Sequence, residues 1–389
     1  MLRSFLPVGQ GALYLEQFQN GVNIVFDCGS STSVELVKDQ IHNTFQRREP
    51  IEAVFLSHMD EDHVNGLGEL LSYCRVKRVY LPYLNETEKV LTKMGLLLEG
   101  EETRRLVEES LSWKLLEDPM GTILTITSQA EHEEPDIYFV MPEGIEDEVY
   151  DQRFGVRYHR SGWPVSLEKL RIGDSAHRWV FVPFNFQFMN RQKCFVKALV
   201  DHGVIGNEKA LAELSEKLRN RNVWAKLKPI LKEIYKKDIP GSINTNSMTL
   251  YSGWSQQEYR DGQYVFRLHS HHKNGCCKRC LYCEQIASGC LYTGDYHAAE
   301  DANWRELKER YIGYWRDIGI MQVPHHISRH SFRPEIAYEN FWFVISVAEK
   351  NRYRHPHATV LKALLQSTSM VSVVTENQGS MLMAEVFGI

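Results

Sequence analysis

A short polar loop directly after an apolar strand restricts the fold of this chain more than any other feature of its sequence. Ala53 to Leu56 is an apolar run, Ser57 to His63 reads SHMDEDH, and helical spacing of apolar residues resumes from Val64 to Tyr73. Strand, loop and helix in this order indicate an α/β fold, in which functional loops gather at strand ends. Imidazoles and carboxylates are the usual ligands of divalent metals. The plain alternative, a solvated acidic loop, does not account for the strand–loop–helix setting.

Apolar strands and amphipathic helices alternate over most of the chain. Asn20-Gly21 between Ala12 to Phe18 and Val22 to Asp27 predicts a β-hairpin, and a helix is expected over Ser33 to Phe45. Acidic amphipathic helices are expected over Glu86 to Asp118. Further strands are expected at Lys77 to Leu81, Thr122 to Thr127, Ile137 to Met141, Trp179 to Phe186, Ser247 to Tyr251, Tyr264 to Leu268, Gly289 to Thr293, Ile318 to Val323, Phe341 to Val347, Val371 to Thr375 and Met381 to Val386.

A long helical stretch from Phe195 to Lys237 interrupts this alternation. With 389 residues the chain exceeds the size at which one hydrophobic core usually stops growing, so insertions or a second domain are expected. We predict the first half of an α/β core over 1–189 and a basic helical insertion over 190–240. The second half follows over 241–389, with a Cys-rich hairpin over 269–290.

Composition and apolar runs narrow the class of protein. The longest strongly apolar run, Phe341 to Ala348, is far shorter than the roughly 20 residues that a membrane-spanning helix needs. The N-terminal residues lack the long apolar stretch and cleavage site of a signal peptide, so a cytoplasmic location without membrane association is expected. A net charge of −5 argues against bulk attraction to nucleic acid but leaves room for a local basic patch.

Two later segments repeat the pattern of a polar group at the end of a strand. Asp295 ends the run Tyr292-Thr293-Gly294-Asp295, and His325 and His326 follow Val323-Pro324. Alone, a strand-end Asp is usually a helix cap, and a lone His is usually a hydrogen-bonded structural residue. Together with His58 to His63 they place metal-ligand side chains at three strand ends of one α/β core.

The order HxDxDH, then Asp after Thr-Gly, then a His pair after a strand resembles the metallo-β-lactamase fold. More narrowly, it is similar to the hydrolase domain of the ComEC-type competence proteins and their standalone soluble relatives. The resemblance implies an αββα sandwich carrying an inserted helical segment. Its further marks are Val8-Gly9-Gln10-Gly11, Phe26-Asp27-Cys28-Gly29, Asn244-Thr245-Asn246-Ser247, Ile345-Ser346-Val347 and Asn351 to Pro356.

The resemblance implies a site with two divalent ions, Mn²⁺, Zn²⁺ or Mg²⁺. His58 and Asp60 would hold the first ion, and Asp62 and His63 the second. Asp295 would bridge both, and His325 would complete the second. Besides Asp62, the resemblance implies catalytic roles for His326 and His355, each as a general acid or a phosphate contact, with a structural His as the alternative for both.

The predicted ligands of the first ion differ from those of many proteins of this fold. Asp60 stands where a His is common, and the middle region offers Asn246 and Ser247 as first-site or substrate contacts in place of another His. A site with fewer imidazoles and more oxygen ligands is harder, which favours Mn²⁺ or Mg²⁺.

The clustered cysteines suggest a separate structural site. Cys277, Cys280 and Cys283 have the close spacing of thiolate ligands, and His271 or His272 offers a fourth ligand for a structural Zn²⁺. A reduced, metal-free hairpin is the alternative.

The inserted helices are rich in basic residues. Their charges could follow a phosphate backbone, although Lys-rich helical faces are usually just solvated. The candidate nucleic-acid contacts are Lys217, Arg219, Arg221, Lys226 and Lys228.

These features together predict a metal-dependent phosphodiester hydrolase, specifically a nuclease that acts on DNA or RNA through a metal-activated hydroxide. One alternative is a hydrolase of a small or cyclic nucleotide signal. Another is a non-catalytic regulatory module with protein partners in a multi-gene defence or toxin assembly. The predicted partners are accordingly a nucleic acid or nucleotide substrate, and a protein in the last case.

Overall fold

The computed structural model describes residues 1–99, 108–144, 156–165, 167, 170, 179–218, 220–239, 247–255, 264–268, 286–328, 331–351, 355–367 and 370–387. Within these residues, no helix is both long and apolar enough to cross a bilayer.

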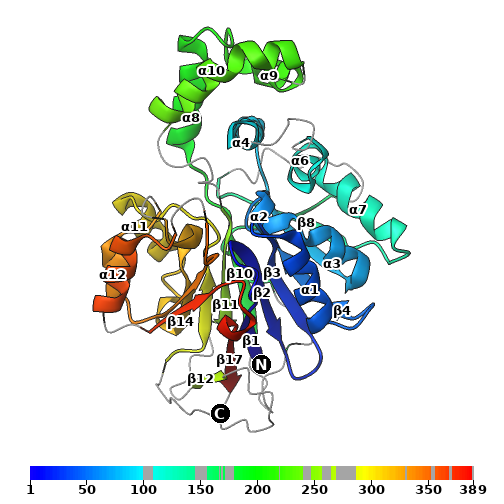
Figure 1. The fold of residues 1–389 in the computed structure, drawn as a ribbon, viewed down its shortest axis with the longest axis vertical. Coiled ribbons are helices and arrows are strands. Elements are labelled where there is room, and N and C mark those ends of the chain that lie inside the picture. Colours follow the sequence, from blue (N-terminus) through cyan, green and yellow to red (C-terminus); the bar gives the residue numbers. More distant parts are fainter. Residues whose placement is uncertain are drawn as a thin grey trace.

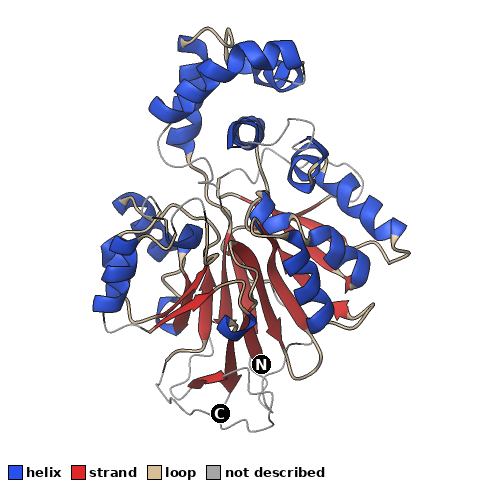
Figure 2. Cartoon of the chain, in the orientation of Figure 1, coloured by secondary structure: helices blue, strands red, loops and turns tan. Residues whose placement is uncertain are grey.

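Two β-sheets lie face to face at the centre of the molecule, with helices on their outer faces (Figures 1 and 2). Among the described residues, the larger sheet has nine strands and the smaller has six. The larger runs β12 (Tyr264–Leu268), β17 (Leu382–Phe387), β1 (Leu2–Phe5), β2 (Gly11–Gln17), β3 (Asn23–Ser30), β5 (Ala53–Phe55), β7 (Arg78–Pro82), β8 (Asp136–Met141) and β9 (Arg157–Arg160). The smaller runs β10 (Trp179–Phe184), β11 (Thr249–Trp254), β13 (Gly289–Tyr292), β14 (Ile318–Gln322), β15 (Trp342–Ser346) and β16 (Val371–Val374). A short pair joins β4 (Pro50–Ile51) to β6 (Arg75–Val76).

The helices cover both outer faces, which confirms the expected αββα sandwich. On the side of the larger sheet lie α1 (Val34–Thr44), α2 (Glu61–Val64), α3 (Leu67–Tyr73), α6 (Leu111–Glu117) and α7 (Pro119–Gln129), while α4 (Glu86–Glu99) lies above the sheets. On the side of the smaller sheet lie α11 (Asp301–Arg310) and α12 (Ala358–Gln366). Short 3-10 turns are η1 (Glu208–Ala210), η3 (Trp315–Asp317), η4 (Pro324–Ile327), η5 (Pro334–Tyr338) and η6 (Gln378–Ser380).

The alternation of side chains along the strands explains the layers. Phe55, Phe181 and Tyr292 point into an apolar core between the two sheets, whereas Val54 and Leu291 point to the outer faces. Residues with a period of two therefore feed separate cores on the two faces of each sheet. The predicted β2–β3 hairpin forms as expected, with Gly21 at a positive φ of 79° in its turn.

A buried ion pair lies within the core between the sheets. The Arg3 side chain is fully buried, and its Nε donates to Glu16 Oε1 at 2.8 Å. Ser252 donates to Glu16 Oε2 at 2.6 Å and Tyr292 donates to Oε1 at 2.9 Å. The Glu16 carboxylate in the larger sheet is thus hydrogen-bonded to two strands of the smaller one.

Strand direction brings the carboxyl ends of many strands to one edge of the sandwich, which we call the carboxyl edge. In the larger sheet, β3, β5, β7, β8 and β9 are parallel neighbours. In the smaller sheet, β13 to β16 are parallel. Strand β11 is antiparallel to both β13 and β10, so β10 has the same direction as β13. Loops after β5, β13 and β14 carry the predicted metal ligands to this edge.

A helical lobe rises from the carboxyl edge between β10 and β11. It contains α8 (Met189–Asp201), α9 (Leu211–Leu218) and α10 (Arg221–Lys237), and Figure 1 shows it above the sheets, beside α4. Asn85 Nδ2 donates to Gln192 Oε1 at 2.9 Å, and Gln192 Nε2 donates to buried Glu88 at 2.8 Å. These bonds attach the start of the lobe to α4 of the core.

One predicted element is wrong: Thr122 to Thr127 is part of helix α7 and not a strand. The Asp118 carboxylate accepts a hydrogen bond from Gly121 N at 2.9 Å, and Pro119 occupies the first turn. A capped start with Pro at this position stabilises a helix enough to outweigh the low helix propensity of β-branched residues. Ile123 and Thr127, one turn apart, then form the buried face.

Candidate metal centre

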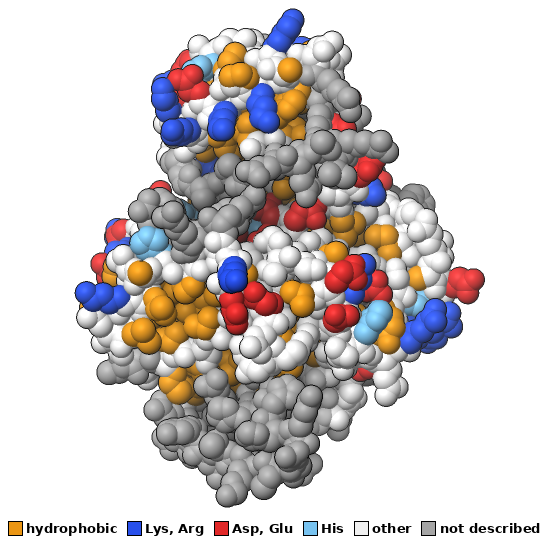
Figure 3. All heavy atoms as spheres, in the orientation of Figure 1, with side chains coloured by type: hydrophobic (Ala, Val, Ile, Leu, Met, Phe, Trp, Pro, Cys, Tyr) orange, Lys and Arg blue, Asp and Glu red, His pale blue; other side chains and the backbone are white. Residues whose placement is uncertain are grey.

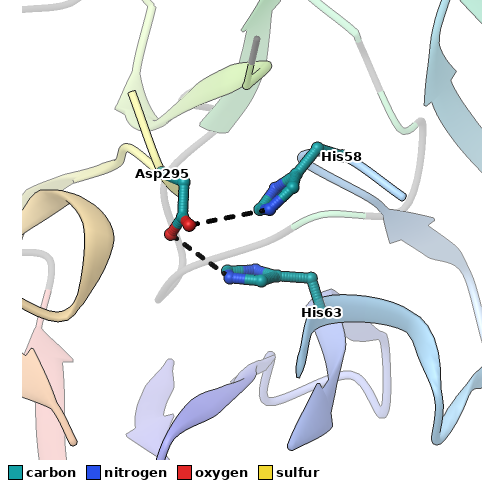
Figure 4. A group of neighbouring side chains, drawn as sticks. All are labelled: His58, His63 and Asp295. Atoms are coloured by element: carbon teal, nitrogen blue, oxygen red, sulfur yellow. Dashed lines mark ion pairs between the residues drawn. The ribbon is translucent and has the colours of Figure 1, made fainter. Parts of the chain in front are cut away.

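Three loops of the carboxyl edge bring their polar side chains together between the sheets. His58 follows β5, His63 lies in α2, and Asp295 follows β13 (Figure 4). Each residue offers one ligand atom, and these atoms lie within 4.8 Å of one another. Residues far apart in the sequence therefore form one cluster.

The two oxygens of Asp295 divide the neighbouring histidines into two pairs. Oδ1 lies 3.3 Å from His63 Nε2 and 3.9 Å from His326 Nε2. Oδ2 lies 3.8 Å from His58 Nε2 and 3.7 Å from His325 Nε2. A carboxylate with imidazoles on both oxygens is suited to bridging two cations.

Two further carboxylates, Asp60 and Asp62, extend the cluster. Asp62 forms one candidate metal-binding group with His63 and His326, and its Oδ2 lies 3.3 Å from His326 Nε2. Asp60 forms another with His58 and Asp62, and its Oδ2 lies 3.5 Å from His58 Nε2. The other five residues predicted as metal ligands, together with His326, thus lie close to Asp295.

The residues of this cluster fit divalent cations. Five buried ligand atoms of the described residues make no hydrogen bond, and they belong to His58 (Nε2), Asp60 (Oδ2), His63 (Nε2), Asp295 (Oδ1) and His326 (Nε2). Leaving buried polar atoms without partners costs free energy. Cations among these nitrogen and oxygen atoms would remove that cost.

Hydrogen bonds orient three of the imidazoles for this purpose. His63 Nδ1 donates to Asp27 Oδ2 at 2.7 Å, and His326 Nδ1 donates to the Ser346 carbonyl at 2.8 Å. His58 Nδ1 lies 2.9 Å from Ser57 Oγ, which itself donates to Asp27 Oδ2 at 2.7 Å. Because each Nδ1 carries the proton, each Nε2 keeps the lone pair that a metal requires.

Neighbouring charges shape the acidity of the carboxylates. Burial alone would raise the pKa of Asp62, but His63 and His326 lower it to about 2. Burial would likewise raise the pKa of Asp295, but His325 and His63 hold it well below its usual range. Both carboxylates are therefore ionised at neutral pH, as metal ligands must be.

The backbone of the histidine pair is strained. His325, His326 and Ile327 have consecutive positive φ angles of 50°, 49° and 66°. A β-branched residue such as Ile rarely adopts this conformation, and strain of this kind concentrates at functional sites. The turn places both imidazoles against Asp295 although they are adjacent in the chain.

Asp27 supports the site, a role that the sequence analysis did not assign. It is fully buried within β3, directly after the residues that pair with β5, and, besides His63 and Ser57 Oγ, it accepts a hydrogen bond from Ser57 N at 2.7 Å. Its position in Phe26-Asp27-Cys28-Gly29, a buried carboxylate in a strand that neighbours β5, was the available signal.

We expect Asp27→Asn to lower metal affinity by about 10- to 100-fold, as loss of a partner behind a metal ligand typically does. An amide has only one acceptor oxygen, so it cannot accept from Ser57 N on one side and from His63 and Ser57 Oγ on the other, as the carboxylate does. Titration calorimetry with Mn²⁺ and Zn²⁺ measures the change. Exposed Asp39→Asn on α1 is the control, and an Asp27 variant with wild-type affinity would contradict the assignment.

Two other residues hold the Asp295 loop. Ser247 Oγ accepts a hydrogen bond from Asp295 N at 3.0 Å, so the structure places Ser247 at the backbone of Asp295. Gln322, which the sequence analysis did not single out, accepts from Thr293 N at 2.8 Å and donates to Gly294 O at 3.2 Å. Asn246 lies outside the described residues.

His355 lies at the rim of the cluster, with its ring centroid 6.3 Å from that of His325. Burial, together with the charges of His326 and His325, lowers the pKa of His355 to about 4, so its imidazole is neutral at pH 7. The predicted structural zinc ligands His271, Cys277, Cys280 and Cys283 lie outside the described residues.

Comparisons with known proteins agree with this fold. Residues 6–114 match the family model described as the metallo-beta-lactamase superfamily, and the matched range includes Ser57 to His63. No curated protein matches the sequence.

Solved structures of low sequence identity are also similar. MEM-A1, a subclass B3 metallo-beta-lactamase from a soil metagenome library, is 16% identical, with 46% of this chain and 48% of that chain covered and a TM-score of 0.25. A long-form RNase Z from yeast is 11% identical, with 89% of this chain and 36% of that chain covered and a TM-score of 0.31. Zn²⁺-bound PqqB from Methylobacterium extorquens is 11% identical, with 45% and 40% covered and a TM-score of 0.20. The alignments thus span less than half the length of each of these solved chains.

Proposed function

We propose, from the metallo-β-lactamase fold of this chain and the superfamily match of its residues 6–114, that it is a metal-dependent phosphodiesterase, specifically a nuclease acting on DNA or RNA. The observation that carries the proposal is the ligand cluster around Asp295, in which three carboxylates accompany four imidazoles. The three carboxylates supply the oxygen ligands that suit the hard cations that accompany phosphoryl chemistry.

Different histidines lie beside the two carboxylate oxygens of Asp295, and this difference supports an assignment of the two cation positions. His63, His326 and Asp62 surround Oδ1 and would hold one ion. On the side of Oδ2, His58 and Asp60 would hold the other, with His325 in place of the His that the middle of the chain lacks. His325 thereby moves from the second ion, where the resemblance put it, to the first.

The protein's own groups would prepare the reaction. Bound divalent ions would polarise phosphoryl oxygens and lower the pKa of water. Asp27 and the Ser346 carbonyl keep the imidazoles of His63 and His326 in the required tautomer. Neutral His355, at the rim beside His325, would orient the substrate by hydrogen bonding.

A panel of labelled nucleic acids tests the proposal. Single-stranded and duplex DNA, RNA and cyclic dinucleotides are incubated with Mn²⁺, Mg²⁺ or Zn²⁺, and products are separated by electrophoresis or chromatography. Wild type should cleave the polymers, and Asp62→Ala should not. Cleavage of the cyclic dinucleotides alone would replace the nuclease by a signal hydrolase. A biological effect that persists in Asp62→Ala would instead favour a regulatory module.

Basic residues on the helical lobe support a polymeric substrate. Figure 3 shows Lys and Arg side chains gathered on the lobe. Lys226 and Lys228 are exposed on α10, while Lys217 on α9 pairs with Glu213 at 3.1 Å. Arg219 lies outside the described residues, and of Arg221 only the backbone position at the start of α10 is described. The other exposed lysines of α10 are Lys232, Lys236 and Lys237.

One row of these lysines lies along a single face of α10. Lys228, Lys232 and Lys236 are spaced four residues apart, so their side chains project in nearly the same direction. Replacing all three by Gln should reduce the slope of log affinity against log salt by about 2 for single-stranded nucleic acid, because each lost phosphate contact removes about 0.7. Fluorescence anisotropy at several salt concentrations measures this.

Lys38→Gln on α1 is the control, because Lys38 pairs with Glu35 on another part of the surface. An unchanged slope in the triple variant would show that this face does not contact phosphates.

A further inference from the structure

A tight turn at the carboxyl edge holds an exposed tryptophan. β9 ends at Arg160, and Trp163 N donates to the Arg160 carbonyl at 3.3 Å, which closes the turn over Ser161 and Gly162. Gly162 has a φ of 77°, which a glycine adopts without strain. His159 Nε2 donates to the Trp163 carbonyl at 2.9 Å. The position of the residue is therefore fixed by its backbone.

The indole of Trp163 is 58% exposed, and among the described residues the other tryptophans are buried or partly buried. The Arg160 guanidinium lies over its ring at 5.5 Å from the centroid. A large exposed aromatic ring with a cation on one face is a common feature of surfaces that bind single-stranded nucleic acid, where bases stack and arginines contact the backbone.

Hydrogen bonds locate this turn at the same edge as the metal centre. Ser161 Oγ donates to the Met141 carbonyl, the last residue of β8, and accepts from Asn185 N, just after β10. Gly162 N donates to the Pro183 carbonyl at 2.9 Å. The turn thus lies against the carboxyl ends of β8 and β10, and both strands point to the edge that carries His58 and Asp295.

The strand order gives its distance from the metal centre. β9 is three strands from β5, and β10 is two strands from β13. With strands about 4.8 Å apart, the turn lies roughly 10–15 Å from the cluster around Asp295. A single nucleotide at the metal centre is too small to reach it, but an extended strand could place a neighbouring base there.

We propose that Arg160 and Trp163 form a base-stacking subsite for a single-stranded nucleic acid substrate. The inference rests on the proposed nuclease function and extends it, because it assigns the substrate as an unpaired strand. The indole supplies a flat surface that accepts any base, and Arg160 supplies positive charge beside it. The ring–cation pair and its rigid turn reduce the ordering cost of binding.

Fluorescence anisotropy in EDTA tests the subsite. The probes are a labelled oligodeoxyadenylate of about 12 nucleotides and an oligoadenylate RNA of the same length. Trp163→Ala should weaken binding by about 5- to 150-fold, the loss expected for one stacked base. Trp163→Phe, which keeps a ring, should recover most of the affinity. The loss should be smaller for a dinucleotide, which is too short to span from the metal centre.

Tyr338→Ala is the matched control. Tyr338 is 83% exposed. The next residue, Glu339, accepts a hydrogen bond from Trp315, which lies just before the amino end of β14. Tyr338 therefore lies at the edge of the sheet opposite to the carboxyl edge. Its replacement should leave affinity unchanged. If the affinity of Trp163→Ala were within about twofold of the wild-type affinity, the stacking subsite would be wrong. The exposed indole would then be better explained as a contact for a protein partner.

Cleavage of the same oligonucleotides by wild type with Mn²⁺ separates the two proposals. Cleavage together with unchanged Trp163→Ala affinity would overturn the stacking subsite alone. Absence of any wild-type cleavage of phosphodiesters would overturn the nuclease proposal, even where Trp163→Ala weakens binding.

Discussion

Asp295→Asn is expected to reduce phosphodiester hydrolysis by roughly 10³-fold or more, because several kcal/mol of charge stabilisation are lost and each 1.36 kcal/mol is a factor of ten. The carboxylate has imidazoles on both oxygens, His63 on one and His58 on the other. An amide keeps the shape but has no charge and offers only one oxygen as a ligand. Initial rates with saturating Mn²⁺, together with metal content by mass spectrometry, measure the effect.

A nearby carboxylate provides the control for Asp295. Asp301 begins α11, is 56% exposed and pairs with Arg333 at 2.7 Å. Asp301→Asn should retain wild-type rates and metal content. If Asp295→Asn also retained both, the bridging role would be wrong, whichever substrate the protein hydrolyses.

Glu16→Ala is expected to lower the free energy of unfolding by about 3–5 kcal/mol, because it leaves the Arg3 charge buried without its counter-ion. The side chains of Arg3 and Glu16 are 0% and 2% exposed, and their atoms are 2.8 Å apart. Ser252 and Tyr292 would lose their acceptor at the same time. Urea titration followed by circular dichroism measures the change.

A double replacement separates the cost of an unpaired charge from that of lost packing. Arg3→Met with Glu16→Leu removes both charges and should restore much of the stability lost in Glu16→Ala. Glu213→Ala, which breaks an exposed pair with Lys217 on the lobe, should leave the urea midpoint unchanged. A Glu16→Ala variant as stable as wild type would show that the pair contributes nothing to the fold.

The fold could be predicted where side-chain periodicity and turn residues agree. The β2–β3 hairpin and helix α1, capped by Ser33, formed as expected, because Asn20-Gly21 and Ser33 fix their boundaries locally. Thr122 to Thr127 was misassigned because strand-forming side chains lie behind an Asp-Pro helix start. Strand β9 was not predicted, since its residues Arg157 to Arg160 show no apolar alternation and pair only through tertiary contacts with β8.

The candidate ligands could be predicted from the sequence because they follow the ends of strands. The residues that each ligand contacts in space could not be predicted. Which oxygen of Asp295 faces His325 and which faces His326 depends on three successive residues with positive φ, which local sequence does not encode. The role of Asp27 likewise depends on the parallel pairing of β3 with β5, which brings its carboxylate to Ser57 and His63. Spacing along the chain carries no information on either contact.

The pairing of β10 with β11 means that the helical lobe is inserted without interrupting the smaller sheet. The two strands are hydrogen-bonded along their whole length, from Trp179 opposite Trp254 to Phe184 opposite Thr249, so the chain leaves and re-enters the sheet at adjacent points. Lengthening, shortening or replacing the intervening helices therefore leaves every ladder bond of the sheet in place. The lobe can therefore differ in length or sequence between related chains while the strands that carry the ligand cluster keep their pairing.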